Sequence, residues 1–302
     1  MFFLPSEDQL DLQRGVRELL AARLPLDRLE DGFDPALWRE LTETGVFGLR
    51  CDLGLGLTEA ALVFEELGRA AVPGPTVGTF LAAGVAEGPV SVLDPHQQPL
   101  LVSDLDVCAA ILVLDPAGPC VIAPVVGTAL AEPLDPLTPL HELAEVPPEV
   151  GTRLDVPIDR VRLEGALLTA ALSVGLAARL TELAVDYAKQ REQFGRPIGS
   201  FQAVKHLCAD MFVRTELARA SLHSAAVMLD DPQAGSAPRA VAGAKQLADE
   251  AATTNGRSAV QIHGGMGFTW EVPVHFLLTR AWMLATDFGT ADEHAEDLAA
   301  LL

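Results

Sequence analysis

Positive charge is scarce in this sequence, because 21 lysine and arginine residues stand against 42 aspartates and glutamates in a chain of 302 residues. The resulting net charge of −21 argues against non-specific binding to nucleic acid or to anionic lipid. Cysteine is also rare, and no two cysteines form a C-x-x-C pair or group with histidine at zinc-ligand spacing. We therefore expect neither structural disulfides nor a metal site from the cysteines, which are Cys51, Cys108, Cys120 and Cys208.

Long uncharged apolar runs are missing as well. No segment reaches the roughly 18 apolar residues expected of a membrane span, and the opening MFFLPSEDQ lacks the basic start of a signal peptide. Hydrophobic residues nevertheless make up 49% of the chain, which is typical of a globular protein and not of a disordered one. We therefore expect a cytoplasmic protein, with a length that suits one large domain or a few subdomains.

The first 89 residues carry the signals of helices. Ser6 and Gln9 form a capping-box pattern before the periodic run 8–24, and Pro35 stands near the first turn of the run 33–49. A third run over 58–72 ends at a VPGP breaker, and residues 76–89 allow one more short helix. The pattern predicts an N-terminal helical domain over residues 1–89.

Residues 90–160 have a different pattern. Short apolar runs alternate with Asp-Pro and Gly-Pro breaks in PLLVSDLDVCAAILVLDPAGPCVIAPVV. Runs of this length between turn residues are typical of short β-strands, and the frequent prolines disfavour helices. We therefore predict a small, shortened β domain in the middle of the chain.

Helical periodicity returns at about residue 161. The first helix is nearly all apolar, so we expect most of it to be buried. Its polar residues form one stripe, made by Arg179, Glu182, Asp186 and Lys189. Further helices are predicted from the apolar face that begins at Phe201, from Pro238 to QIHGGMGF, and over VPVHFLLTRAWML. The predicted fold class is mostly α, with a helical N-terminal domain, a truncated middle β domain and a C-terminal four-helix bundle over 161–302.

One stretch of this acidic chain gathers positive charge. Residues 189–206 read KQREQFGRPIGSFQAVKH and place Lys189, Arg191, Arg196 and Lys205 around two glycine-containing turns. The stretch is either a solvated helix end or a site for an anionic ligand. Its composition alone does not decide between these interpretations.

Three patches of the C-terminal part stand in a definite order, at 187–206 (YAKQREQFGRPIGSFQAVKH), 261–281 (QIHGGMGFTWEVPVHFLLTRA) and 286–290 (TDFGT). Together they resemble the C-terminal domain of the acyl-CoA dehydrogenase family, whose recurrent signatures are R-x-x-F-G-x-x-x-x-x-x-Q and Q-x-x-G-G-x-G. FDPALWRELTETGVFGL and EELGRAAVPGP resemble the N-terminal helical domain of the same family. The resemblance covers 1–89 and 164–302, and it implies the family's fold, FAD as cofactor and acyl-CoA thioesters as substrates.

The resemblance gives the basic stretch a role. In the family, the flavin of one subunit lies against the C-terminal helices of its neighbour, and an arginine at the position of Arg191 meets the FAD pyrophosphate. A planar guanidinium suits this role because it can donate two parallel hydrogen bonds to phosphate oxygens. The other residues that the resemblance places at FAD are Gln193, Phe194, Ile198, Gln261, Gly264, Gly265 and Thr290.

These implied contacts differ in kind. Phe194 would pack on the cofactor, and Ile198 would lie near its adenine half. Glycine at 264 and 265 would let backbone N–H groups approach an anion, since no Cβ stands in the way. The alternative is that these glycines only end a helix, as glycine commonly does. The remaining positive side chains are expected to be solvated, and they are Lys189, Arg196 and Lys205.

The positions at which the family carries its catalytic base hold no acid here. Dehydrogenation needs a carboxylate that removes the α-proton of the thioester while the flavin accepts the β-hydride. The two positions that family members use for this glutamate align with Phe288 and Gly165. Glu164 and Asp287 stand one residue away, but one helical step turns a side chain by about 100°. We therefore expect no catalytic residue, with Glu164 and Asp287 as weak candidates.

The middle domain also departs from the family. The T-E-P-x-x-G-S segment that holds the flavin ring has no counterpart between residues 90 and 125. The departures imply a non-catalytic or half-site subunit, resembling the degenerate chain of actinobacterial heteromeric enzymes that act on steroid side-chain CoA esters. The implied partners are a second dehydrogenase subunit that shares the FAD in a heterotetramer, an acyl-CoA substrate and an electron-transfer flavoprotein. Two alternatives stay open, namely a self-sufficient dehydrogenase with Glu164 as displaced base and a non-enzymatic helical scaffold.

Overall fold

The computed structural model describes residues 4–148 and 150–301. The N-terminal part consists of helices α1 (Glu7–Arg23), α2 (Pro35–Glu43), α3 (Leu57–Arg69) and α4 (Thr76–Leu81), with the short 3₁₀ helix η1 (Leu26–Asp31) after α1. The Ser6 hydroxyl and the Gln9 side chain cap the start of α1 reciprocally. At the start of α2, the Asp34 carboxylate accepts a hydrogen bond of 2.8 Å from the N–H of Ala36. The predicted capping signals are therefore used as the sequence indicates.

The middle of the chain forms two small sheets. One has the order β1-β3-β4-β7 and consists of β1 (Val90–Leu93), β3 (Ala110–Val113), β4 (Cys120–Ile122) and β7 (Gly151–Arg153). The other has the order β2-β6-β5 and consists of β2 (Leu101–Ser103), β6 (Leu140–Glu142) and β5 (Thr128–Ala129). β1 pairs with β3 in parallel, and the other pairs are antiparallel. A separate small core that includes Val102, Ile111 and Val113 holds the sheets together.

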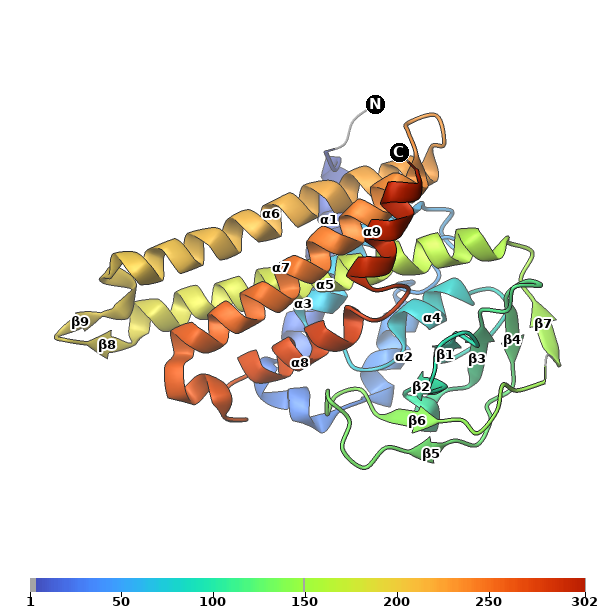
Figure 1. Cartoon of the computed structure of the whole chain (residues 1–302), viewed down its shortest axis with the longest axis horizontal. Coiled ribbons are helices and arrows are strands. Elements are labelled where there is room, and N and C mark those ends of the chain that lie inside the picture. The colour runs from blue at the N-terminus through green and yellow to red at the C-terminus, as the bar shows by residue number, and fades with distance from the viewer. Residues whose placement is uncertain (1–3, 149, 302) are drawn as a thin grey trace.

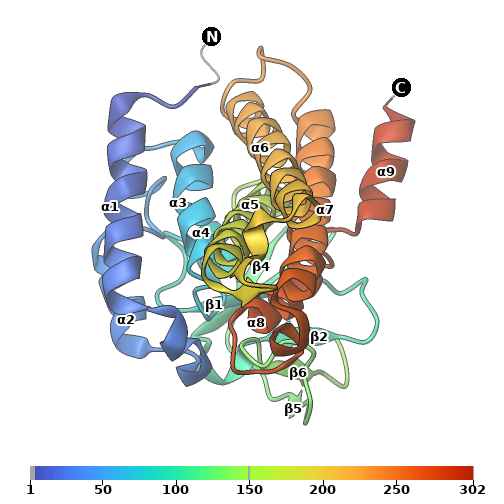
Figure 2. The ribbon, with the colours of Figure 1, turned by 90° about the vertical axis from the view of Figure 1, so that its left-hand side faces the viewer.

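The C-terminal part is a bundle of α5 (Ile158–Gln190), α6 (Gln202–Asp230), α7 (Ala237–His263) and α8 (Val274–Leu284), followed by α9 (Ala291–Ala300). The three longest helices, α5, α6 and α7, run side by side along the molecule, and the sheets pack at one end below them (Figure 1). α5 lies at the centre, because α3 packs on one side of it and α6, α7 and α8 pack on the other sides (Figure 2). The observed fold confirms the predicted mostly helical class.

α5 is the one helix among residues 4–148 and 150–301 that is long and apolar enough to span a membrane. In its most apolar 18-residue window, 83% of the residues are buried inside the protein. Its apolar surface is therefore used by the protein core, as the sequence pattern predicts.

Two glycines let α3 and α5 cross in backbone contact. A Cβ at Gly68 of α3 would lie 2.1 Å from the carbonyl oxygen of Leu172 in α5. A Cβ at Gly175 of α5 would lie 2.0 Å from the carbonyl oxygen of Glu65 in α3. Because both separations are far below any real Cβ contact, the two helices cannot pack this closely with a larger residue at either position.

Buried carboxylates on α3 tie it to α1 and α6. Arg219 of α6 donates to Glu65 at 2.7 Å, and Arg17 of α1 donates to both oxygens of Glu66 at 2.8 and 2.6 Å. A buried carboxylate without a cation is strongly destabilising, so these pairs fix which helices lie beside α3.

The helix boundaries differ from the sequence pattern in a few places. α2 ends at Glu43, six residues before the end of the predicted run, because Gly45 takes a φ of +84° and stops the helix. α9 is not predicted, although Thr290 and Glu293 form the capping box that begins it. The hairpin of β8 (Glu192–Gln193) and β9 (Arg196–Pro197) is also not predicted from the sequence, and it lies within the basic stretch.

Candidate functional site

Arg191 is the first residue after α5, and the backbone around it is held on both sides. Its N–H donates to the carbonyl oxygen of Tyr187 at 2.8 Å, and its own carbonyl oxygen accepts from the N–H of Ile198 at 2.8 Å. Between them, Phe194 and Gly195 occupy the hairpin turn with φ values of +54° and +74°. Two central residues with positive φ characterise the type I′ turn, which favours glycine, so Phe194 is strained there. Phe194 is 90% exposed.

The glycine-rich patch lies next to this hairpin. α7 ends at His263, and Gly264 follows with φ +61° and ψ −137°, which only glycine adopts without strain. The Tyr187 ring stacks on the His263 ring at a centroid distance of 4.2 Å, so the ends of α5 and α7 meet. The bundle-end patch is the surface formed there by Arg191, Gln193, Phe194, Ile198, Gln261, Gly264 and Gly265. All but one of the residues implied for FAD thus lie on the segments that follow or end α5 and α7, whose ends meet at Tyr187 and His263.

The exception is Thr290, which lies at the start of α9. Its hydroxyl accepts a hydrogen bond of 3.3 Å from the N–H of Glu293 and donates one of 3.0 Å to the Glu293 carboxylate. Thr290 is therefore engaged as the cap of α9, near Phe288 and not in the bundle-end patch.

The positive side chains near the patch are not equivalent. Lys189 pairs with Asp186 at 3.5 Å, and the Arg196 guanidinium lies 4.2 Å above the centre of the Phe201 ring. The guanidinium of Arg191 is exposed and makes no hydrogen bond or ion pair with any described residue. Arg191 therefore keeps its full set of donors available for an external anion.

The two positions at which the family carries its base touch each other. The side chain of Phe288 lies against Gly165 of α5, so closely that a Cβ at position 165 would be 2.1 Å from the ring. Phe288 has a φ of +55°, and its carbonyl oxygen accepts a hydrogen bond of 3.1 Å from Nε2 of His294. One hydrocarbon ring thus fills the space beside both positions.

Glu164 points elsewhere. It is 2% exposed, and its two carboxylate oxygens accept from Arg50 at 2.6 Å and from Arg160 at 2.7 Å. Both oxygens are bonded, and Glu164 is not among the residues that line the cavity beside Phe288. The geometry therefore gives Glu164 a structural role in joining α5 to the segment after α2.

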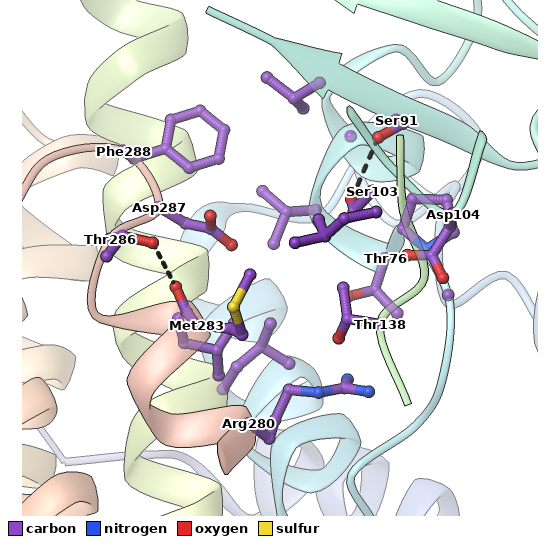
Figure 3. Close-up of a pocket in the computed structure, with 18 of the residues that line it drawn as sticks. Thr76, Ser91, Ser103, Asp104, Thr138, Arg280, Met283, Thr286, Asp287 and Phe288 are labelled. Carbon is purple, nitrogen blue, oxygen red and sulfur yellow. Dashed lines mark hydrogen bonds between the residues drawn. The ribbon is translucent and has the colours of Figure 1, made fainter. Parts of the chain in front are cut away.

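A cavity of about 180 Å³ lies between the loop after α8 and the strands β1 and β2 (Figure 3). Phe288 and Asp287 form part of one wall, and Asp287 points into the space. Solvent reaches Asp287, but the protein atoms around its carboxyl displace much of the bulk water. This desolvation raises the pKa of Asp287 to about 6, although Lys245 opposes the shift. Asp287 is thus a carboxyl with an altered proton affinity that faces an open space.

Two family models match this chain. Residues 6–90 match the model of the acyl-CoA dehydrogenase N-terminal domain, and residues 163–302 match that of the C-terminal domain. Acyl-CoA dehydrogenase IpdE2 of Mycobacterium tuberculosis is 34% identical to this chain, over 92% of each protein. This chain belongs to the acyl-CoA dehydrogenase family. The identity to IpdE2 extends through the middle of the chain, so the short β part is shared with a relative of almost the same length.

Two similar solved structures carry the same fold. The ChsE4-ChsE5 complex from Mycobacterium tuberculosis contains a chain that superposes with a TM-score of 0.82 at 23% identity, over 99% of this chain and 98% of that one. The steroid ACAD Tcur3481-Tcur3483 superposes with a TM-score of 0.81 at 23% identity, over 98% of this chain and 97% of that one. At this identity the likeness establishes the dehydrogenase fold of the chain.

Sequence reasoning missed the polar wall of the cavity. Asp104, Thr76 and Arg280 line it, and they come from three distant segments with no shared motif. A buried aspartate with a left-handed backbone, such as Asp104, has no sequence signal that separates it from a turn residue. Among the described residues, no group of histidine, cysteine, aspartate or glutamate is arranged to hold a metal ion.

Proposed function

We propose that this dehydrogenase-family chain is the non-catalytic subunit of a heteromeric, FAD-dependent acyl-CoA dehydrogenase. The contact between Phe288 and Gly165 carries the proposal, because neither family position for the base holds an acid and the Phe288 ring occupies the space that a side chain at position 165 would need. The likeness to a chain of the ChsE4-ChsE5 complex supports a place among multi-subunit dehydrogenases.

The bundle-end patch fits the phosphate side of a flavin nucleotide held by another subunit. Arg191 offers an unpaired guanidinium, Gln261 an exposed amide, and Gly264 an exposed backbone without a side chain. Phe194 is a large apolar ring held in water by a strained turn, which is unfavourable unless something covers it. A cofactor bound at the junction of two subunits would satisfy all of these groups at once.

The chemistry requires a partner for its remaining parts. A flavin, when bound, accepts the β-hydride of the acyl thioester, and a carboxylate must take the α-proton. In this chain, Phe288 can exclude water from the space beside Gly165, but it can neither take nor give a proton. The base and the grip on the flavin ring are therefore assigned to the partner, and one FAD would serve each pair of unlike chains.

The substrate, the electron acceptor and the location belong to the same proposal. A bulky acyl-CoA of the steroid side-chain type is supported by the words "steroid ACAD" in the name of a similar structure. An electron-transfer flavoprotein is proposed as the acceptor of the electrons, and the cytoplasmic location stays a prediction from composition.

A second candidate function is dehydrogenation in this chain's own cavity. The observation that favours it is Asp287, whose raised pKa of about 6 suits a general base near neutral pH. Glu164 supports this candidate less, because Arg50 and Arg160 occupy its oxygens. A scaffold without any cofactor is the third candidate. The unpaired guanidinium of Arg191 counts against it, because a scaffold that binds no anion has no use for this group.

Flavin stoichiometry separates these candidates. The chain is purified alone and again after co-expression with a full-length acyl-CoA dehydrogenase subunit from the same genome, and FAD is measured by absorbance after denaturation. The proposal expects little FAD in the lone chain and about one FAD per pair of unlike chains in the complex. Stoichiometric FAD in the lone chain would support the second candidate, and none in the complex would support the scaffold.

A further inference from the structure

The last helix is attached to the loop that carries Phe288 through one buried side chain. α9 is ten residues long, and His294 is the only one of them that is buried. The Nε2 atom of His294 donates a hydrogen bond of 3.1 Å to the carbonyl oxygen of Phe288. The same atom would lie 2.8 Å from a Cβ at position 289, so the imidazole lies directly against the loop backbone, where glycine leaves room for it. His294 therefore connects α9 to the loop of residues 285–290.

The backbone of this loop has a conformation that it would not keep by itself. Phe288 has a φ of +55°, and Gly289 follows with a φ of +107°. A positive φ is unfavourable for a residue with a bulky side chain, and it persists only where the surrounding structure enforces it. Two contacts do so here, because the Phe288 ring lies against Gly165 of α5 and the Phe288 carbonyl oxygen is bonded to His294 of α9. The loop is thus held from both ends of the same residue.

The neutral form of His294 suits this contact. Burial lowers the pKa of His294, and the Lys245 ammonium of α7 acts in the same direction. The carbonyl oxygen of Phe288 and the carboxylates of Asp297 and Glu293 oppose the shift. A neutral imidazole carries one N–H, and the hydrogen bond to a carbonyl oxygen requires this N–H to be at Nε2.

A second hydrogen bond ties α9 to α7 near the surface. The side-chain amide of Gln246 donates to the carbonyl oxygen of Ala291 at 2.9 Å, whereas the capping box of Thr290 and Glu293 bonds α9 only to its own start. The helix lies at the edge of the molecule beside α7 (Figure 2). A helix this short is marginal in water without packing contacts. α9 is therefore the kind of terminal segment that opens locally at a low free energy.

We propose that α9 and the loop of residues 285–290 form one latch, which opens as a unit and keeps Phe288 seated on Gly165 only while His294 is docked. When the latch opens, the loop loses the contacts that enforce its positive φ values, and the ring leaves α5. Gly165, which is buried under the seated ring, is then uncovered. The seated ring is therefore a conformational state that the C-terminal helix controls.

Hydrogen–deuterium exchange of the full-length chain, followed by mass spectrometry at about pH 7.5, tests the latch. Peptides from 285–290 and 291–301 should exchange in the same time range in the wild type, and faster than those of α5. His294→Leu removes the donor and keeps an apolar side chain, so it should speed exchange about tenfold in both segments. His294→Gln places an amide N–H near the position of Nε2 and should restore most of the protection. His206→Leu, at an exposed histidine of α6, should exchange as the wild type does.

Gly165→Ala tests the latch from its other end. The new methyl group overlaps with the seated Phe288 ring, so it should open the loop and also speed exchange in 291–301, although position 165 lies on α5. Exchange in α6 should stay unchanged, which distinguishes local opening from global unfolding. Gly15→Ala is the matched control, since a Cβ at Gly15 meets nothing within 4 Å, and it should leave both segments as in the wild type.

Gln246→Ala keeps the test decisive if the leucine variant fails to fold, because Gln246 is only partly buried and its amide bonds α9 near the surface. This variant should speed exchange in both segments about threefold. Faster exchange confined to 291–301 in His294→Leu or Gln246→Ala would show that α9 frays by itself and would overturn the proposal. Equal exchange of His294→Leu and His294→Gln, or wild-type exchange of 291–301 in Gly165→Ala, would overturn it as well.

Discussion

The ring of Phe288 lies against the α-carbon of Gly165, across the gap between the loop after α8 and the central helix α5. The two residues are separated by more than a hundred positions in sequence. Glycine at position 165 leaves room for the Phe288 ring, and a larger residue there would overlap with the ring. These are the two positions at which family members carry the catalytic carboxylate, and in this chain they pack against each other instead. The proposed role of the chain therefore depends on how firmly this pair is coupled.

The first expectation concerns that coupling. Gly165→Ala places a methyl group 2.1 Å from the Phe288 ring, so it should lower the free energy of unfolding by about 1–3 kcal/mol. Phe288→Ala in the same chain should remove most of this loss. The measurement is urea unfolding of both single variants and the double variant, which gives the coupling energy.

Gly15→Ala in α1 is the matched control, since a Cβ at Gly15 meets nothing within 4 Å. It should raise the free energy of unfolding by about 0.5–1 kcal/mol, as alanine does in helix interiors. Equal stabilisation by Gly165→Ala and Gly15→Ala would contradict the close contact.

The second expectation concerns Arg191. Arg191→Ala should weaken FAD retention in the complex by about 1.5–3 kcal/mol, through loss of a charge-assisted hydrogen bond. Arg191→Lys should restore only part of the affinity, because lysine lacks the planar fork. FAD release is followed by fluorescence during dilution of the complex.

Lys205→Ala is the control for charge alone, because Lys205 is another exposed cation of the same basic stretch. It should release FAD as slowly as the wild type. If Arg191→Ala and Lys205→Ala behave alike, the bundle-end patch is only a solvated helix end.

The third expectation concerns pH. Burial raises the folded pKa of Asp104 to about 7, so the fold favours its neutral form. Its contribution to stability is complete below about pH 4 and is lost as the pH rises toward the folded pKa. Between pH 5 and pH 8, the wild type should lose on the order of 2–4 kcal/mol more stability than Asp104→Asn.

Urea unfolding at the two pH values provides this comparison, with Asp155→Asn as the control for loss of one exposed carboxylate. Asp155→Asn should follow the wild type. Parallel pH profiles for the wild type and Asp104→Asn would show that Asp104 is ionised in the folded protein throughout.

Local signals in the sequence were sufficient for most of the helical fold. The capping box at Ser6 and Gln9, and the apolar run of α5, depend on neighbours in the chain, so their outcome could be predicted. The capping box of α9 was equally readable at Thr290 and Glu293, but the run after it is short and mostly polar. The Phe194 hairpin could not be predicted, because phenylalanine is unusual at positive φ.

The polar residues that line the cavity could not be predicted from the sequence. Asp104, Thr76 and Arg280 line one cavity although they come from distant segments, and Arg280 is held there by Asp135 and the carbonyl oxygen of Leu137. Nothing in their local sequence encodes this arrangement. The orientation of Glu164 toward Arg50 depends on a contact across 114 residues. Tertiary packing determines which residues meet at such positions, so they could not be predicted from the sequence. The residues of the bundle-end patch could be named from the sequence because they stand in contiguous motifs.

The most direct test of the central claim is the turnover of the assembled complex, measured as dye-linked oxidation of an acyl-CoA with FAD content determined for every variant. A positioned general base is worth about 10²–10⁴ in rate. Replacing the partner subunit's own base should therefore abolish turnover, while Asp287→Asn and Glu164→Gln in this chain should leave it within a few-fold of the wild type. A hundredfold loss on Asp287→Asn or Glu164→Gln, with FAD content and fold unchanged, would show that this chain supplies the base and would contradict the account.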